Sequence, residues 1–320
     1  MKIDQGVRGH LGTLESAGLI KLAQLLPDLE YLFRHALVQD AAYASLLPDD
    51  QRRLHQAVGH AVEDLYNDRL DEYSAMLARH FTRAGEDDRA LVYYLRAGEA
   101  ALAAFASEEA EAHYRAALTL SCSLEQKVRL QSGLGDALSV QGRFEESVEA
   151  HLRGAGLCQQ MGDLDGAADL YARASRNAWN ADDTPRGLQL ALEGLEFVKG
   201  GPPGSGLARL THEAARAYFF NGQSEPAAKL CRTAQHMAEQ LGDKTLQADI
   251  LTTLGVMPGL APEDAVAALN RAVELAEESG PAAVAQRAHH NLAVMLEGAF
   301  ANLPEARKHY LKGSELARAR

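Results

Sequence analysis

Apolar residues recur along most of the chain with the period of an amphipathic helix, in segments that are interrupted at nearly regular intervals. The interruptions fall at "QGRFEE", "ADDTPRG" and "NGQSEP", and at the glycines of "MGD" (161–163) and "LGD" (241–243), which are residues typical of helix ends and turns. No alternating strand pattern follows residue 35. The pattern therefore predicts an all-α protein built from helical hairpins.

Small residues return at fixed places in these segments. One series lies in the first helix of successive units, spaced 40, 40, 40 and 38 residues apart: Gly135, Ser175, Ala215, Gly255 and Ala293. Two further series lie seven residues apart in the second helix, hence on one stripe: Ser147, Gly187, Ala227, Ala265 and Ala306, then Gly154, Gly194, Ala234, Ala272 and Gly313. Because small side chains let helix axes approach closely, each unit is expected to pack tightly within itself and on its neighbours.

Composition supports helix packing and narrows the range of partners. The sequence is 47% hydrophobic but only 6% aromatic, and Ala and Leu dominate the apolar set, which favours close helix packing over a sheet core. The formal net charge of -12 disfavours broad nucleic-acid binding, because such a surface repels phosphate backbones. We therefore expect a protein, a peptide or a small molecule as the partner.

Cysteine spacing and hydropathy favour the cytoplasm. Cys122, Cys158 and Cys231 form no CxxC pair, which argues against a structural zinc site and against a secreted disulfide scaffold. The start "MKIDQGVRGH" lacks the apolar core of a signal peptide, and no stretch approaches the roughly 20 apolar residues that span a bilayer. We expect no contact with a membrane.

The histidines lack the spacing of a metal site. His289 and His290 are adjacent, so on a helix they point about 100° apart, and His55 and His60 are five residues apart. Neither pair has the spacing of four residues that would let two histidines on a helix share a metal. The interpretation is that these imidazoles are packing or solvated side chains, and we expect no metal.

Phosphate chemistry and carboxylate catalysis find no support either. No GxxxxGK[ST] loop occurs, and "GPPGSGLAR" at 201–209 lacks the lysine that such a loop uses to reach phosphates. The acidic clusters at 86–88 and 108–111 are typical of first helical turns, where carboxylates favour the positive end of the helix dipole. We therefore expect no catalytic residues, no cofactor and no enzyme activity.

The small-residue pattern resembles the tetratricopeptide repeat (TPR), in which the eighth, twentieth and twenty-seventh positions are small and a glycine near the fifteenth is matched here by Gly142 and Gly222. The resemblance covers about residues 69–320. The spacing exceeds the usual repeat of about 34 residues, which is similar to the longer helices in the repeat arrays of signal-transduction ATPases and related transcription activators. The resemblance implies a TPR-like α-solenoid, a right-handed superhelix of helical hairpins.

Residues 9–35 carry a second resemblance. "LGTLESAGLIKL", a short extended piece and then "FRHALVQ" resemble the junction in signal-transduction ATPases, including those fused to nucleotide cyclases, where a winged-helix module ends and helical repeats begin. This implies a winged-helix remnant at 1–35, a helical connector at 36–68 and the repeat array at 69–320. It also implies that the chain is the carboxy-terminal regulatory part of a larger ATPase, either excised or encoded alone.

In a tetratricopeptide superhelix the first helices line a concave groove, with the second, fifth, ninth and twelfth positions facing in. In the register of about 40 residues these positions give Arg176 and Trp179 in one unit, then His212, Arg216 and Phe219 in the next. Guanidinium and aromatic groups on adjacent turns can hold a carboxylate or phosphate while stacking an apolar group. The alternative is that the aromatic residues pack between units and the arginines are solvated.

Two functional hypotheses remain. The first is a non-enzymatic protein-interaction scaffold or sensor in signal transduction, whose groove binds a peptide or protein segment. The alternative is a small-molecule-sensing regulatory domain of a larger ATPase, cyclase or transcription regulator, as in the maltose-type activators. DNA binding is disfavoured, because the amino-terminal fragment retains little more than one helix and a wing and the chain is acidic.

Overall fold

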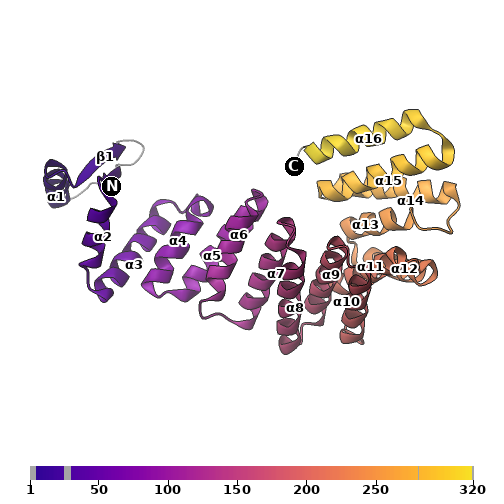
Figure 1. Cartoon of the computed structure of the whole chain (residues 1–320), viewed down its shortest axis with the longest axis horizontal. Helices are drawn as coiled ribbons and strands as arrows, with labels where there is room; N and C mark the ends of the chain where they lie inside the picture. The colour runs from indigo at the N-terminus through magenta and orange to yellow at the C-terminus, as the bar shows by residue number, and fades with distance from the viewer. Residues whose placement is uncertain (1–4, 25–29, 280, 319–320) are drawn as a thin grey trace. The chain divides into compact units, whose positions relative to one another are not determined.

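The computed structural model describes residues 5–24, 30–279 and 281–318. Within these ranges it contains sixteen α-helices and one two-stranded antiparallel sheet, drawn in Figure 1. Contacts between residues divide the chain into two compact units, 1–93 and 94–320. The predominance of helix predicted from the apolar pattern is confirmed.

In the first unit a helix and a β-hairpin precede a run of helices. Strands β1 and β2 pair antiparallel, with Ile20 opposite Phe33 and Leu22 opposite Tyr31. Helix α1 and this hairpin occupy the place where a helix and a wing were expected. The elements are α1 (Gln5–Ser16), β1 (Ile20–Gln24), β2 (Glu30–Phe33), α2 (Ala36–Ala44), α3 (Pro48–Leu65), α4 (Leu70–Ala84) and the start of α5 (Asp87–Ala103).

The core of the first unit forms where α3 packs on α4. A glycine is required on α3, because a Cβ atom at Gly59 would lie 2.9 Å from the ring of Phe81. Phe81 is fully buried and stacks on Tyr93, with 5.7 Å between the ring centroids. Close approach at a small residue thus already organises this part of the chain.

The second unit is a row of helical hairpins that follows the end of α5 and α6 (Ser107–Leu118). The first helices of successive hairpins begin about 40 residues apart, as the sequence spacing predicted, and α9, α11, α13 and α15 pack on one another in series. The hairpins are α7 (Leu124–Val140) with α8 (Phe144–Met161), α9 (Leu164–Asn180) with α10 (Thr184–Phe197), α11 (Ser205–Phe220) with α12 (Ser224–Leu241), α13 (Lys244–Leu254) with α14 (Pro262–Ser279), and α15 (Ala282–Phe300) with α16 (Leu303–Arg318).

The small-residue series lie where the two helices of a hairpin approach most closely. Ser147 Oγ on α8 donates a hydrogen bond to the carbonyl oxygen of Gly135 on α7, at 2.7 Å. In the next hairpin Ser175 Oγ donates to the carbonyl oxygen of Gly187 at 2.8 Å, and a Cβ atom at Gly187 would lie 3.1 Å from the Ser175 carbonyl oxygen. The close approach of helix axes that the small residues predicted is confirmed in these two hairpins.

The turn inside each hairpin uses a left-handed residue. Gly142 and Gly222 have φ values of 74° and 75°, a conformation that glycine adopts without steric cost. The hairpin between them places Asp182 at the equivalent position, with φ 62°. The repeat therefore imposes the same backbone turn even where the sequence lacks the glycine.

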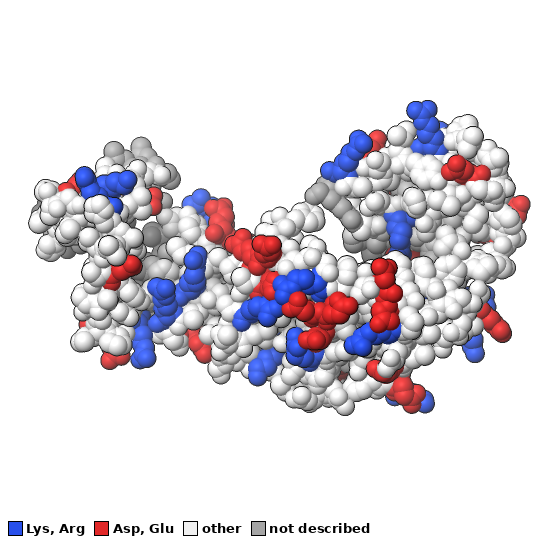
Figure 2. Space-filling model, viewed as in Figure 1, with Lys and Arg blue, Asp and Glu red and all other residues white. Residues whose placement is uncertain are grey.

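The surface carries charges of both signs. On the face drawn in Figure 2, basic and acidic side chains are interspersed and do not gather into a single basic area. No helix within the described ranges is both long enough and apolar enough to cross a bilayer.

Candidate ligand-binding groove

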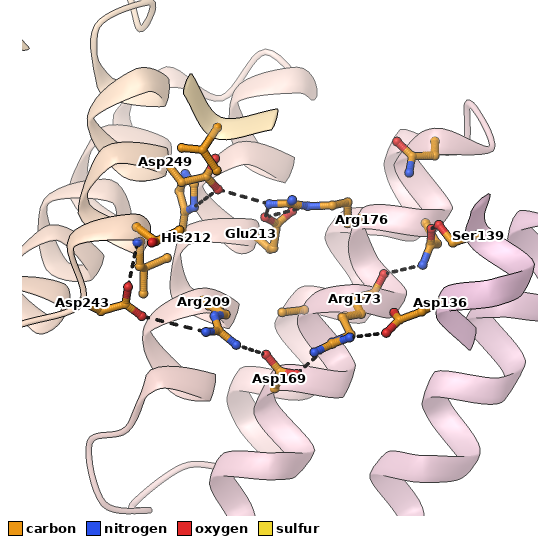
Figure 3. A pocket seen from close by; sticks show the side chains of 16 residues that line it. Asp136, Ser139, Asp169, Arg173, Arg176, Arg209, His212, Glu213, Asp243 and Asp249 are labelled. Carbon is orange, nitrogen blue, oxygen red and sulfur yellow. Dashed lines mark hydrogen bonds and ion pairs between the residues drawn. The ribbon is translucent and has the colours of Figure 1, made fainter. Parts of the chain in front are cut away.

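The first helices of the hairpins line a pocket of about 430 Å³. Figure 3 shows side chains from α7, α9, α11 and α13 converging on it. Helix α9 contributes most, through one stripe that contains Asp169, Arg173, Arg176, Asn177 and Asn180. These residues recur at three- and four-residue intervals, which places them on one face of the helix.

A second pocket of about 360 Å³ adjoins the first. It is lined by α5, α6, α7 and α9, and it includes the apolar residues Leu102 and Val128. Both pockets share Asp136, Asp169 and Arg173 in their walls. The two pockets therefore form one elongated groove in the second unit, with Arg173 near its middle.

A chain of ion pairs crosses the floor of the groove (Figure 3). Arg173 donates to Asp136 on α7 at 2.7 Å and to Asp169 on α9 at 2.8 Å. Arg209 on α11 donates to the other oxygen of Asp169 at 2.8 Å and lies 3.8 Å from Asp243, the N-cap of α13. Alternating charges thus connect four successive hairpins.

A second ion-pair cluster is formed by residues of α9, α11, α13 and α15. Glu213 accepts hydrogen bonds from Arg176 and from Arg216, whose Nη1 lies 3.1 Å from Glu213 Oε1. Asp249 accepts from Arg287 and lies 3.4 Å from Arg176 Nη2. Three guanidinium groups therefore surround two carboxylates that are almost completely buried.

The cluster fixes the charge state of its members. Burial would raise the pKa of the Glu213 carboxyl, but the charges of Arg176 and Arg216 outweigh burial and hold it far below its ordinary value. Burial would also raise the pKa of Asp249, but the charges of Arg287 and its neighbours outweigh burial, and the pKa is lowered. Burial lowers the pKa of His212 to about 4. At neutral pH the carboxylates are ionised and the imidazole is neutral.

The composition of this cluster does not favour a metal ion. His212, Glu213 and Asp249 do present ligand atoms that lie within 4.8 Å of one another. However, both carboxylates already pair with arginine, and His212 Nε2 lies 2.9 Å from the hydroxyl of Thr253. A cation would have to displace guanidinium groups from both acids, so the geometry fits an ion-pair cluster better than a metal site.

Of the residues predicted to face the groove, two line the larger pocket. Arg176 has 43% of its side chain exposed there, whereas His212 is buried at the pocket wall. Phe219 lies away from the pocket, where it packs against a core cluster that includes Ala215 and Cys231. The next residue, Phe220, points to the other side of the helix. It occupies the position that the repeat register had assigned to Phe219.

Trp179 and Arg216 lie beside the pocket, in an inter-hairpin stack. The ring of Trp179 on α9 stacks on Phe220 of α11, with 4.8 Å between centroids. The guanidinium carbon of Arg216 lies 5.5 Å from the Trp179 centroid, while its Nη1 reaches Glu213. Arg216 is buried, so it connects the aromatic stack to the ion-pair cluster and its head group does not face the open groove.

Sequence reasoning missed the ion-pair chain. The signal that indicates it is a pair of opposite charges one repeat apart: Asp169 and Arg209 are separated by 40 residues and therefore occupy the same position in successive hairpins. Arg173 and Asp136 are 37 residues apart and meet in the same way.

No protein-family model and no curated protein matches the chain. Among solved structures it is similar to the apo form of RapI, with a TM-score of 0.64 and 12% identity over 88% of this chain and 79% of that one. It is also similar to NprR in complex with its cognate peptide NprX, with a TM-score of 0.54 and 16% identity over 81% of this chain and 80% of that one.

A further neighbour is a Signal Transduction ATPase with Numerous Domains (STAND) protein with a tetratricopeptide repeat sensor, from Pyrococcus horikoshii. Its TM-score is 0.54 at 14% identity over 95% of this chain, and the match spans 58% of the length of that protein. At such identities the likeness concerns the fold. The chain is a TPR-like α-solenoid, as its small-residue register predicted.

Proposed function

We propose that the chain is a non-enzymatic interaction and sensor module of signal transduction whose groove binds a peptide or protein segment. The observation that carries the proposal is the meeting of two pockets at Asp136, Asp169 and Arg173. An extended segment would occupy both pockets, whereas a compact ligand would fill one. Long concave surfaces of this kind are the usual binding faces of solenoids.

The groove also offers the chemistry of backbone recognition. Asn180 lies on the same stripe of α9 as Arg176 and lines the larger pocket, and its side chain makes no hydrogen bond to another described residue. A carboxamide has both donors and an acceptor, so it can pair with the N–H and C=O of a bound chain. The similar fold of NprR was solved in complex with a peptide, which supports a peptide as the ligand.

The second candidate is a small-molecule-sensing regulatory domain of a larger ATPase, cyclase or transcription regulator. The volume of the larger pocket, about 430 Å³, lies within the range of small-molecule sites. The likeness to the STAND protein supports an origin in such an ATPase. In this proposal residues 1–35 are the end of a winged-helix module, 36–68 a connector and 69–320 the repeat array, and the protein acts in the cytoplasm.

The two candidates are separated by comparing ligands on the same protein. Trp179 is the only tryptophan, and its stack contacts the cluster that holds Arg176, so its fluorescence should report ligand entry. The full chain is titrated with a metabolite panel and, separately, screened on an array of random decapeptides. Peptide binding that is lost in Arg176→Ala and kept in Arg186→Ala, a change at an exposed site on α10, supports the proposal. A response to metabolites alone would favour the second candidate.

A further inference from the structure

Resting on the proposed function, we propose that the group held at the centre of the groove is a carboxylate, bound by Arg173 and Arg176 on α9. It would be supplied by an acidic side chain or by the carboxyl terminus of the bound segment. The acids of the pocket are paired with arginines of the protein, whereas both of these arginines face solvent and keep a free N–H group.

Every carboxylate that lines the pocket has an arginine neighbour. Each one has at least one guanidinium partner, and together they are balanced by an equal number of arginines. A cationic ligand would therefore have to compete with an internal arginine for every acid. The acids are Asp136, Asp169, Glu213, Asp243 and Asp249, and their partners are Arg173, Arg176, Arg209, Arg216 and Arg287.

The acids of the second cluster are also less accessible than the arginine in front of them. The side chains of Glu213 and Asp249 are 7% and 14% exposed, against 43% for Arg176. Arg173, in the ion-pair chain, is 37% exposed, which is close to the 39% of its partner Asp136 and above the 20% of Asp169. At the second cluster a molecule that enters the groove therefore meets the guanidinium group of Arg176 before the acids.

Both arginines keep an unused end. Arg173 bonds through Nε and Nη1, and Arg176 bonds through Nε and Nη2. Within the described part of the chain, Arg173 Nη2 and Arg176 Nη1 have no hydrogen-bond partner. The two residues are three positions apart on one face of α9, so each contributes a free guanidinium N–H on the side of the helix that lines the groove.

Their internal partners hold these arginines in place. Arg173 is fixed between Asp136 and Asp169, and Arg176 is held by Glu213. Side chains that are ordered before binding lose little entropy when a ligand arrives, which favours tight recognition by the planar guanidinium group. The internal carboxylates thus position the donors and leave their free ends for the ligand.

The test uses decapeptides recovered from the array. Each is resynthesised with Asp changed to Asn and Glu changed to Gln, and each is made with a free and with an amidated carboxyl terminus. We expect the loss of one carboxylate to weaken binding roughly ten- to 150-fold, the range typical of a charge-assisted contact. If the Asn or Gln replacement weakens binding, the bound carboxylate is a side chain. If amidation weakens binding, the bound carboxylate is the carboxyl terminus. The affinity should also fall as ionic strength rises.

Protein variants test the residues. Arg173→Ala and Arg176→Ala should each reduce the discrimination between acidic and amide peptides, whereas Arg186→Ala should retain it. Arg173→Lys and Arg176→Lys keep the positive charge and should recover only part of the affinity. They provide a second test of the site if the alanine variants lose stability. Circular dichroism melts establish that each variant is folded.

Citrate and inorganic phosphate, followed by Trp179 fluorescence, separate a free anion from a peptide. If acidic and amide peptides bind equally well, the carboxylate inference is wrong while the peptide groove stands. If no peptide binds but citrate or phosphate binds in a manner that depends on Arg176, the anion site stands and the peptide proposal falls. If none of these probes binds, both are overturned.

Discussion

At the scale of single residues, Asp182 occupies a backbone conformation that suits glycine. Its φ of 62° matches those of Gly142 and Gly222 at the same place in the flanking hairpins. Its side chain is exposed. We expect Asp182→Gly to raise the free energy of unfolding by about 0.5 to 1 kcal/mol, since relief of left-handed strain exceeds the added freedom of the unfolded chain. Chemical denaturation measures the difference.

The neighbouring aspartate provides the control. Asp183 caps α10, because its carboxylate accepts a hydrogen bond from the Arg186 amide at 3.0 Å. Asp183→Ala should therefore lower stability by about 1 kcal/mol. A loss of stability in Asp182→Gly would show that the Asp182 side chain has a role that the turn does not explain.

A second residue with a measurable effect is His212. Burial lowers its pKa to about 4 even though Asp249 and Glu213 oppose the shift. The unfolded chain takes up a proton here below about pH 6.5, while the folded chain does so only near pH 4. The unfolded state therefore binds more protons across this window, and stability falls as the pH falls. This group alone should contribute a loss of about 3 kcal/mol.

The measurement compares pH profiles of unfolding free energy for wild type and His212→Gln between pH 7 and 4. The glutamine keeps a polar partner for Thr253 but does not titrate, so its profile should be shallower over this range. All other titratable groups are common to the two proteins, so the difference between the profiles reports His212. Parallel profiles would show that His212 is protonated in the folded protein as readily as in the unfolded chain.

The groove-facing residues show what a repeat register can and cannot predict. It placed Arg176 and His212 at the pocket because helical position alone decides which way they point. It selected Phe219, yet Phe220 stacks on Trp179, since adjacent residues differ by about 100° around the helix and a small rotation exchanges their roles. The repeat register thus predicts the order of the helices better than it predicts which of two adjacent side chains on a helix faces the groove.

At the scale of elements, close contact between the two helices of a hairpin depends on side-chain size. Ala227 on α12 is fully buried, as is Ala215 on α11 at the matching small position. We expect Ala227→Leu to overpack this contact and to lower the free energy of unfolding by about 1 to 3 kcal/mol. Urea denaturation, with circular dichroism as the probe, measures the change.

Lys229→Leu is the matched control, because Lys229 lies two residues further along α12 and is exposed. It adds the same side chain without entering the contact, so its stability should differ little from wild type. An unchanged denaturation midpoint in Ala227→Leu would mean that the hairpin relaxes to accept the larger residue.

The hairpins were predictable from sequence to a greater extent than their ionic connections. Small residues act locally, so Ser147 and Gly135 signal the contact that they form. The ion pairs join side chains of different hairpins, and Arg173 is placed between Asp136 and Asp169 by helix tilt and rotamer choice together. Sequence offers candidate pairs one repeat apart but does not choose among them.

At the scale of the whole molecule, the second unit is held together by contacts between successive elements. The hairpin α11–α12 packs on α9 and α10 before it and on α13 after it. Stability in such an array is a sum of hairpin terms and neighbour terms, so unfolding should be broad or stepwise and not a single sharp transition. A substitution that destabilises one hairpin should therefore affect mainly that hairpin and its direct neighbours.

Hydrogen exchange in Ala227→Leu tests this locality. Amides of α11 and α12 should exchange faster than in wild type, those of α9, α10 and α13 should change less, and those of α7, α8 and α16 should keep their rates, because local opening involves only the elements that lose contacts. Mass spectrometry of peptic fragments reads each helix separately, and Lys229→Leu again supplies the baseline. Uniform acceleration across the second unit would show instead that its hairpins unfold as one cooperative body. Ligand binding in the groove would then change the stability of every hairpin in the array.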